Sequence, residues 1–206
     1  MENGLPRLNL TEEQTRALIL EKAHGLFAQY GYNKTTVADI ANACGFSSAS
    51  VYRHFSSKSA INEAMADLML KGMIAVADTA MAERESATDK LTAMIESLHA
   101  QTVENFSGRE KMHETLLAGI EEKWDAILQY RSALLERATA LVRLGVDQGE
   151  FHVTDIEQAA LGLHMSLKRL FHPLVVVDML DEPDAGSVPI FLDFAFAALG
   201  AARSDQ

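Results

Sequence analysis

Apolar residues recur at every third or fourth position along most of the chain, which is the period of an α-helix with one buried face. The first such stretch begins at Thr11, whose hydroxyl can cap the free amides of a turn that carries Glu12 and Glu13. It ends at Gly31, because glycine suits the left-handed conformation that follows many helices. Its apolar stripe consists of Ile19, Leu20, Ala23, Leu26, Phe27 and Tyr30. The pattern predicts a first helix over residues 11–30.

Two short helices and one long helix come next in the pattern. The short helices begin at hydroxyl residues that can serve as caps, namely Thr35 or Thr36 and then Ser47 or Ser48. Gly45 ends the first of them, and the second runs through Phe55. Their inward positions are apolar or small: Val37, Ile40, Ala41, Cys44, Val51 and Phe55. The long helix begins near Lys58.

Helical stretches separated by short polar breaks fill the rest of the chain. The predicted helices cover residues 89–105, 110–121, 124–145, 155–180 (disturbed at Pro173) and 188–201. The pattern therefore predicts an all-α protein in which a compact unit of small helices precedes a larger bundle. We expect a flexible arm at residues 1–10, the small-helix unit at 11–57 and the larger helical domain at 58–206.

Composition agrees with a folded helical chain. Of 206 residues, 48% are hydrophobic, four are proline and one is cysteine, so Cys44 has no partner for an intrachain disulfide. The chain does not start with a basic and then apolar leader, and no stretch of about 18 uncharged apolar residues could span a membrane. We therefore expect a cytoplasmic protein without membrane contact.

The net charge of −11 is unevenly distributed. Residues 1–59 hold six Lys or Arg and five Asp or Glu, so they carry +1 and the remainder carries −12. An acidic body repels a polyanion, so any contact with nucleic acid is expected from the N-terminal part.

The spacing of Ala41, Gly45 and Val51 is typical of a helix-turn-helix. A small residue is needed where the two helices cross, glycine allows the turn four residues later, and Val51 packs back from the second helix. The outward positions of that second helix carry hydroxyls, a guanidinium and an imidazole: Ser47, Ser48, Ser50, Tyr52, Arg53 and His54. Groups of these kinds bind phosphates and base edges. Lys58 can place a charge, and the amide end of its helix, against a phosphate.

Residues 15–62 resemble the N-terminal part of TetR-family transcriptional regulators. The matching positions are Phe27, Gly31, Tyr32, Thr35, Thr36, Ile40, Ala41, Gly45, Tyr52, Phe55 and Lys58. The resemblance implies a repressor that binds a near-palindromic double-stranded DNA operator as a homodimer. It also implies that a small molecule bound in the C-terminal domain releases the operator.

The resemblance also assigns roles by position. Those that would contact phosphate are Thr36, Tyr52, His54 and Lys58, and those that would approach the bases are Ser47, Ser48, Ala49 and Ser50, with Arg53 at the edge. Many family members have Lys-Gly or a similar pair where this chain has Ser48-Ala49. The loss of that cation removes one possible contact and leaves the base preference open.

The larger half of the chain shows candidate binding surfaces and no catalytic motif. Apolar positions that should meet inside the bundle are candidates for an effector site: Met94, Leu98, Phe106, Leu116, Trp124, Leu163, Leu167 and Phe171. The alternative is that they form ordinary core. Candidates for a dimer interface lie on the last two helices: Leu163, Leu170, Phe191, Phe194, Ala195 and Ala198. The alternative is that both helices are buried within one subunit.

Metal binding and catalysis find no support in the sequence. The histidines of this half lack the close spacing with other ligands that metal sites need, and His164 and His172 are eight residues apart. No nucleophile triad, phosphate loop or paired carboxylates are present, so we expect neither a cofactor nor enzymatic activity. Two other functions are compatible with the helices: an enzyme or ligand carrier, and an activator or DNA-bound scaffold without an effector.

Overall fold

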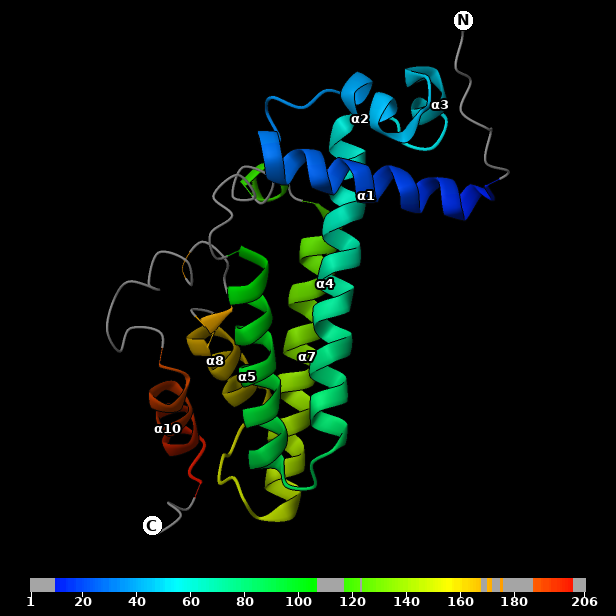
Figure 1. Ribbon diagram of the computed structural model, residues 1–206. Helices are drawn as coiled ribbons and strands as arrows, with labels where there is room; N and C mark the ends of the chain where they lie inside the picture. The colour runs from blue at the N-terminus through cyan, green and yellow to red at the C-terminus, as the bar shows by residue number, and fades with distance from the viewer. Residues whose placement is uncertain are drawn as a thin grey trace, which may run out of the picture. The chain divides into compact units, whose positions relative to one another are not determined.

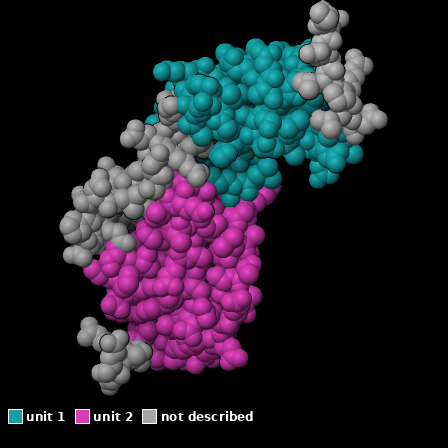
Figure 2. Space-filling model, viewed as in Figure 1, with its two compact units in different colours: residues 1–69, 109–127 teal, residues 70–108, 128–206 magenta. Residues whose placement is uncertain are grey.

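The computed structural model describes residues 10–106, 117–122, 124–167, 170–171, 175 and 187–201. Over these residues the regular elements are helices and no strand is present, which confirms the predicted all-α fold (Figure 1). Two compact units make up the chain: residues 1–69 with 109–127, and residues 70–108 with 128–206 (Figure 2). We call them the first and the second unit.

The first unit contains α1 (Glu12–Tyr30), α2 (Val37–Cys44), α3 (Ser48–Tyr52) and the start of α4 (Lys58–Ala82). The caps form as the sequence predicts. The Thr11 hydroxyl accepts a hydrogen bond from Gln14 N while the Gln14 side chain accepts one from Thr11 N. Gly45 ends α2 with φ at 71°, a left-handed conformation that suits glycine. The helix α3 ends at Tyr52, three residues earlier than predicted.

One apolar core holds the helices of the first unit together. Its buried residues are Ile19, Leu20, Ala23, Phe27, Tyr32, Val37, Ile40, Ala41, Val51, Phe55 and Ile61. Ala41 and Val51 are both buried, as the helix-turn-helix spacing predicts. Tyr30 was expected in the stripe of α1 but is 52% exposed. The reason is that Tyr32, just after the helix, fills the core there and packs edge-on against Phe27 with ring centroids 5.3 Å apart.

The second unit contains the rest of α4, with α5 (Ala87–Phe106), most of α7 (Asp125–Gln148), α8 (Ile156–Leu167) and α10 (Val188–Ala198). The predicted helices 89–105, 124–145 and 188–201 are confirmed within three residues at each end. The helix predicted at 155–180 ends at Leu167, and its remainder, with Pro173, lies largely outside the described residues. Of the predicted helix 110–121, residues 117–122 are described and are helical.

Polar contacts tie the helices of the second unit together. The first-turn amides of α5 have no partner within the helix, and the carboxylate of Glu150 accepts from Thr88 N at 2.8 Å and Thr88 Oγ1 at 2.7 Å. Arg137 on α7 donates to both carboxylate oxygens of Asp78 on α4, each at 2.6 Å. In the described part of the chain, no helix is long and apolar enough to cross a membrane.

Candidate nucleic-acid interface and effector site

The candidate DNA contacts all lie in the first unit, on α3 and beside it. Ser47 caps α3, which carries Ser48, Ala49, Ser50 and Tyr52, and Arg53 and His54 follow directly. Thr36 caps α2 and Lys58 begins α4. Tyr52 is 53% exposed although α3 is anchored from its other face by the buried Val51. The polar side of α3 therefore faces outward, and its apolar side packs on the core of the first unit.

Hydrogen bonds along α3 order the guanidinium of Arg53. The Ser47 hydroxyl accepts from Ser50 N at 3.2 Å, and the two serine hydroxyls lie 3.0 Å apart. Arg53 Nη2 donates to Ser50 Oγ at 3.3 Å. This contact uses one of the five N–H groups of the guanidinium. The rest of the exposed Arg53 head remains suited to a phosphate or a base edge.

Two of the candidate phosphate contacts already serve structural roles. The Thr36 hydroxyl donates to Asp39 Oδ2 at 2.6 Å, and this bond lowers the pKa of Asp39. A hydroxyl has one proton, so Thr36 can donate to a phosphate only by releasing Asp39. Lys58 Nζ donates to Tyr32 O at 2.7 Å and lies 4.2 Å from the centroid of the Tyr32 ring. An ammonium has three donors, so Lys58 can make this contact and still reach a phosphate.

The ring and the backbone of His54 are both partly buried or bound within the first unit. Its ring atom Nδ1 is buried and finds no hydrogen-bond partner among the described residues, so Nδ1 is not available to a phosphate in this conformation. Its backbone oxygen accepts from Arg16 Nη1 at 2.6 Å, and the Arg16 guanidinium lies 4.2 Å from the centroid of the Phe55 ring. Sequence reasoning missed this role of Arg16, because its partners lie 38 and 39 residues further along the chain.

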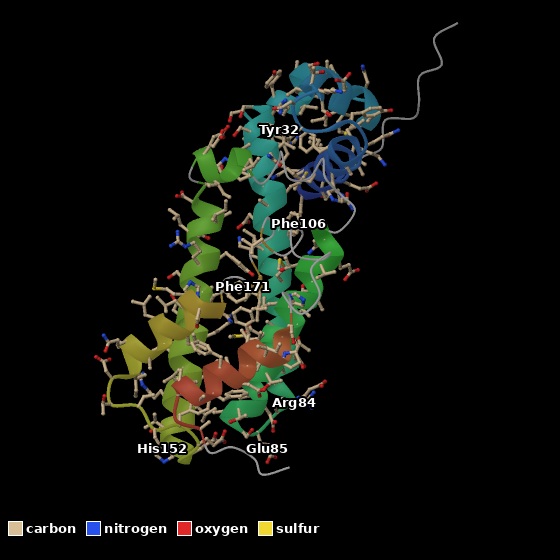
Figure 3. The ribbon with its side chains drawn as sticks, turned by 90° about the vertical axis from the view of Figure 1, so that its left-hand side faces the viewer. Tyr32, Arg84, Glu85, Phe106, His152 and Phe171 are labelled. Atoms are coloured by element: carbon tan, nitrogen blue, oxygen red, sulfur yellow. The ribbon has the colours of Figure 1, made fainter. Side chains whose placement is uncertain are left out.

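Most candidates for the effector site are buried in the second unit. Met94, Leu98, Phe106, Leu163 and Phe171 are each 7% exposed or less, and Phe106 and Phe171 are labelled in Figure 3. Trp124 is buried in the first unit instead. Leu116 and the side chain of Leu167 lie outside the described residues. An effector site built from these residues therefore centres on the second unit, without Trp124.

Tyr130 is a further candidate that the sequence did not reveal. It packs against the apolar core of the second unit, and its hydroxyl is buried with no hydrogen-bond partner among the described residues. Burial raises the pKa of this hydroxyl. A buried hydroxyl without a partner costs about 1–3 kcal/mol, and such groups call for a ligand or water to bind them. No group of three metal-ligating residues occurs in the part of the chain that the structure describes.

The dimer candidates divide between the core and the surface. Leu163, Leu170 and Ala195 are buried in the core of their own unit, where packing within the subunit already covers them. Phe191 is half-buried, whereas Phe194 and Ala198 are exposed. Further exposed apolar residues accompany them at a spacing of four on each helix: Leu161 and Met165 on α8, and Ile190 before Phe194 on α10. We call these exposed residues of α8 and α10 the apolar ridges.

Comparisons with known proteins agree with this architecture. The family model of the bacterial regulatory proteins of the tetR family matches residues 19–65, and that of the tetracyclin repressor-like C-terminal domain matches residues 87–186. The chain is 31% identical over 121 residues to the HTH-type transcriptional repressor KstR2 of Mycobacterium tuberculosis. That match covers 59% of this chain and 57% of the repressor, little more than half its length. Over 59 residues, 29% of this chain and 27% of the relative, it is 46% identical to the KstR2 repressor of Rhodococcus jostii.

Solved structures show the same fold. The TetR family transcriptional regulator PfmR of Thermus thermophilus is 28% identical, with a TM-score of 0.60 over 90% of this chain and 98% of that one. A regulatory protein in the tetR family from Rhodococcus is 21% identical, with a TM-score of 0.62 over 92% and 98% of the two chains. The fold and the candidate interface define an all-α protein with an N-terminal helix-turn-helix. The chain belongs to the TetR family of bacterial regulatory proteins.

Proposed function

We propose that this protein is a transcriptional repressor that binds a near-palindromic operator as a homodimer and is released by a small-molecule effector. The observation that carries the proposal is the outward face of α3, where Tyr52 is exposed and Arg53 is ordered by Ser50 on a helix anchored by buried Val51. The names of the relatives, which are transcriptional repressors, support the same function.

In the proposed complex α3 enters the major groove of DNA. Ser47, Ser48, Ala49 and Ser50 approach the base edges, and Arg53, at the edge of the contact, faces a phosphate. Tyr52, His54 and Lys58 contact phosphates, which supply most of the affinity and make it depend on salt. A dimer presents two such helices to successive major grooves about 34 Å apart, which accounts for a palindromic site.

The dimer is proposed to form through the apolar ridges of α8 and α10. Monomeric proteins seldom expose contiguous apolar patches of large area, and a self-complementary patch on two copies makes a closed dimer. Met165 and Phe194 are 67% and 62% exposed, so they contribute the most newly buried area. Their burial in the dimer would remove these side chains from water.

The effector is proposed to bind in the second unit, among the buried residues Met94, Leu98, Leu163 and Phe171. Such a lining suits a mostly apolar molecule, and the Tyr130 hydroxyl supplies a polar contact that orients it. An effector acts by preferring the conformation that does not bind DNA, with a coupling free energy of about 1–3 kcal/mol.

The test of the proposed function is selection of DNA from a randomised duplex library by the full chain, followed by affinity measurements on the recovered sequence. We expect a near-palindrome that the wild type binds tightly. Tyr52→Phe in both subunits should weaken binding about thirtyfold, since each of the two subunits loses one hydrogen bond to phosphate that contributes about 1 kcal/mol. The matched control is Tyr30→Phe, because Tyr30 is 52% exposed in the same unit. Recovery of no common sequence would contradict the proposal.

A further inference from the structure

Residues 117–122 and Trp124 belong to the first unit, although they lie far from the helix-turn-helix in sequence. Ala118 packs against the core that holds α1, α2 and α3. The Trp124 ring covers Gly119 so closely that a Cβ atom there would lie 2.6 Å from Trp124 Cε3. Trp124 N also donates to Gly119 O at 3.2 Å. We call residues 117–122 and 124 the Trp124 turn, a compact structure closed by its own indole.

Glu122 joins this turn to the beginning of α4. Its Oε2 atom accepts a hydrogen bond from the Ser59 hydroxyl and a second from Trp124 Nε1 at 3.0 Å. Both bonds lower the pKa of Glu122, that from Ser59 the more, so the carboxylate stays ionised at neutral pH. A charged acceptor makes stronger hydrogen bonds than a neutral one. Glu122 thus links the Trp124 turn to α4, because its carboxylate binds Trp124 on one side and Ser59 on the other.

The Glu122 contact lies next to a candidate DNA contact, because Ser59 directly follows Lys58 in the first turn of α4. Burial is the main cause of the raised pKa of the Tyr32 hydroxyl, and the charge of Glu122 raises it further. On the other side, Tyr32 accepts a hydrogen bond from Lys58 through its backbone oxygen. Within the first unit Glu122 therefore contacts Ser59, the neighbour of Lys58 in the first turn of α4, and Lys58 contacts the backbone of Tyr32.

We propose that Glu122 is a positioning residue for DNA binding: through Ser59 it fixes the first turn of α4, and with it Lys58, in the conformation that binds the operator. The proposal rests on the DNA-binding function proposed above. It has a regulatory consequence, because α7 begins at Asp125, directly after the Trp124 turn, and continues into the second unit. A movement of α7 caused by an effector would displace Glu122 and break its hydrogen bond with Ser59. The first turn of α4 would then lose this constraint.

A simpler role for Glu122 makes the opposite prediction. A carboxylate near a DNA-binding surface repels phosphates, so its removal alone would strengthen binding, most of all at low salt. A positioning role requires that removal weakens binding at every salt concentration. The sign of the change therefore separates the two roles.

The experiment measures operator affinity by fluorescence anisotropy for the full-length wild type and for Glu122→Ala, Glu122→Gln and Ser59→Ala. We expect Glu122→Ala to weaken binding about threefold to tenfold. Glu122→Gln should recover part of the loss, because its amide oxygen accepts the same hydrogen bonds. The double variant Ser59→Ala with Glu122→Ala should bind no worse than the weaker single variant, since both remove the same contact. Glu121→Ala is the matched control, because it removes an exposed neighbouring carboxylate and keeps the contact between Glu122 and Ser59, so it should not weaken binding.

Unchanged or tighter binding by Glu122→Ala would overturn the proposal. The melting temperature should change little, since contacts of an exposed carboxylate contribute little to stability. If the wild type itself bound no duplex, the proposed function would fail and the positioning role would be judged by hydrogen exchange. Faster exchange of the amides of residues 59–63 in Glu122→Ala than in Glu121→Ala would then support the connection, and equal exchange would overturn it.

Discussion

Single side chains hold the outward end of α3 in place, and their partners lie far away in sequence. Arg16 is the main example: it binds the backbone oxygen of His54 at 2.6 Å and lies on the face of the Phe55 ring. The backbone that follows α3 therefore depends on a residue in α1. Phosphate contacts by His54 require that this backbone keeps its position.

Replacement of Arg16 should destabilise the first unit and weaken operator binding. Arg16→Ala loses a charged hydrogen bond and a contact with an aromatic ring, for a cost of about 1–3 kcal/mol in the free energy of unfolding. Urea unfolding at fixed protein concentration measures it. Arg131→Ala, the same truncation at an exposed position, is the control and should cost less than about 0.5 kcal/mol. Equal effects of the two variants would contradict the role of Arg16.

Tyr130 provides a prediction for the effector site. Tyr130→Phe removes a buried hydroxyl that lacks a partner among the described residues, so stability should stay the same or rise. Operator affinity should not change, whereas the concentration of effector needed for release should increase. Thermal unfolding and a release titration with compounds found by screening measure these effects. A loss of stability would mean that the hydroxyl has a structural partner.

The sequence predicted the local features of the site better than its long-range contacts. Ser47 as a cap and Tyr52 as an exposed side chain follow from helical spacing over a few residues. The partner of Lys58 did not follow, because Tyr32 approaches it across a gap of 26 residues in sequence. The sequence left open whether Leu170 and Ala195 are buried within one subunit or between two, since an apolar helix has the same composition whether a neighbouring helix or a second copy covers it.

At the level of helices, the second unit depends on close contacts at helix ends. Phe151 follows the end of α7 and packs on Gly145, where a Cβ atom would lie 2.0 Å from its ring. The carboxylate of Glu150, one residue earlier, caps α5. The loop after α7 therefore fixes both α7 and α5. Helical periodicity predicted α5 and α7 but could not predict this loop, whose contacts cross about 60 residues of sequence.

A methyl group at Gly145 should disrupt this packing. Gly145→Ala forces the buried Phe151 ring to move, for an expected loss of about 1–3 kcal/mol in the free energy of unfolding. Gly72→Ala is the matched control, because Gly72 is also inside a helix and a Cβ atom added there would meet nothing within 4 Å. It should gain about 0.5–1 kcal/mol from helix propensity. Urea unfolding of both variants should give opposite signs, and a gain in both would contradict the packing argument.

The ion pair between α4 and α7 should make stability depend on pH. The hydrogen bonds from Arg137 hold the pKa of Asp78 below its usual value. The ionised Asp78 therefore stabilises the fold above the unfolded-state pKa of about 3.9, and this contribution is lost as the pH falls through the lower folded-state pKa.

Asp78→Asn should lower stability at pH 7 by about 1 kcal/mol or less, because the Asp78 side chain is 45% exposed and solvent screens the pair. The difference from wild type should shrink as the pH falls below about 4. Urea unfolding at several pH values measures it, with the exposed Asp147→Asn as control. A difference that grew toward acid pH would contradict the assignment.

At the scale of the whole molecule, the N-terminal residues with a slight positive charge and the exposed apolar ridges lie in different units. The chain carries −11 overall, while residues 1–59 carry +1 with six basic and five acidic residues. Contact with DNA is therefore confined to residues 1–59 of the first unit in our proposal. Association between copies is assigned to the second unit, through the apolar ridges of α8 and α10.

A charge on the apolar ridges should shift the protein from dimer to monomer. In Phe194→Glu, a side chain that is 62% exposed in one subunit would place a carboxylate in the proposed interface. Sedimentation velocity measures the change, and operator affinity should fall with it, because two half-sites are no longer bound together. Leu68→Glu is the control, since Leu68 is 58% exposed in the first unit. A dimer that persisted in Phe194→Glu would place the interface elsewhere.

The most direct test of the central claim, that α3 binds DNA, is the salt dependence of operator affinity in wild type and Arg53→Ala. With two cations per subunit, Arg53 and Lys58, the wild-type affinity should fall about a hundredfold between about 50 and about 200 mM salt. Arg53→Ala in both subunits should reduce the slope of log affinity against log salt by about 2. Arg131→Ala should leave the slope unchanged. A wild-type affinity insensitive to salt, or an unchanged slope in Arg53→Ala, would contradict the claim.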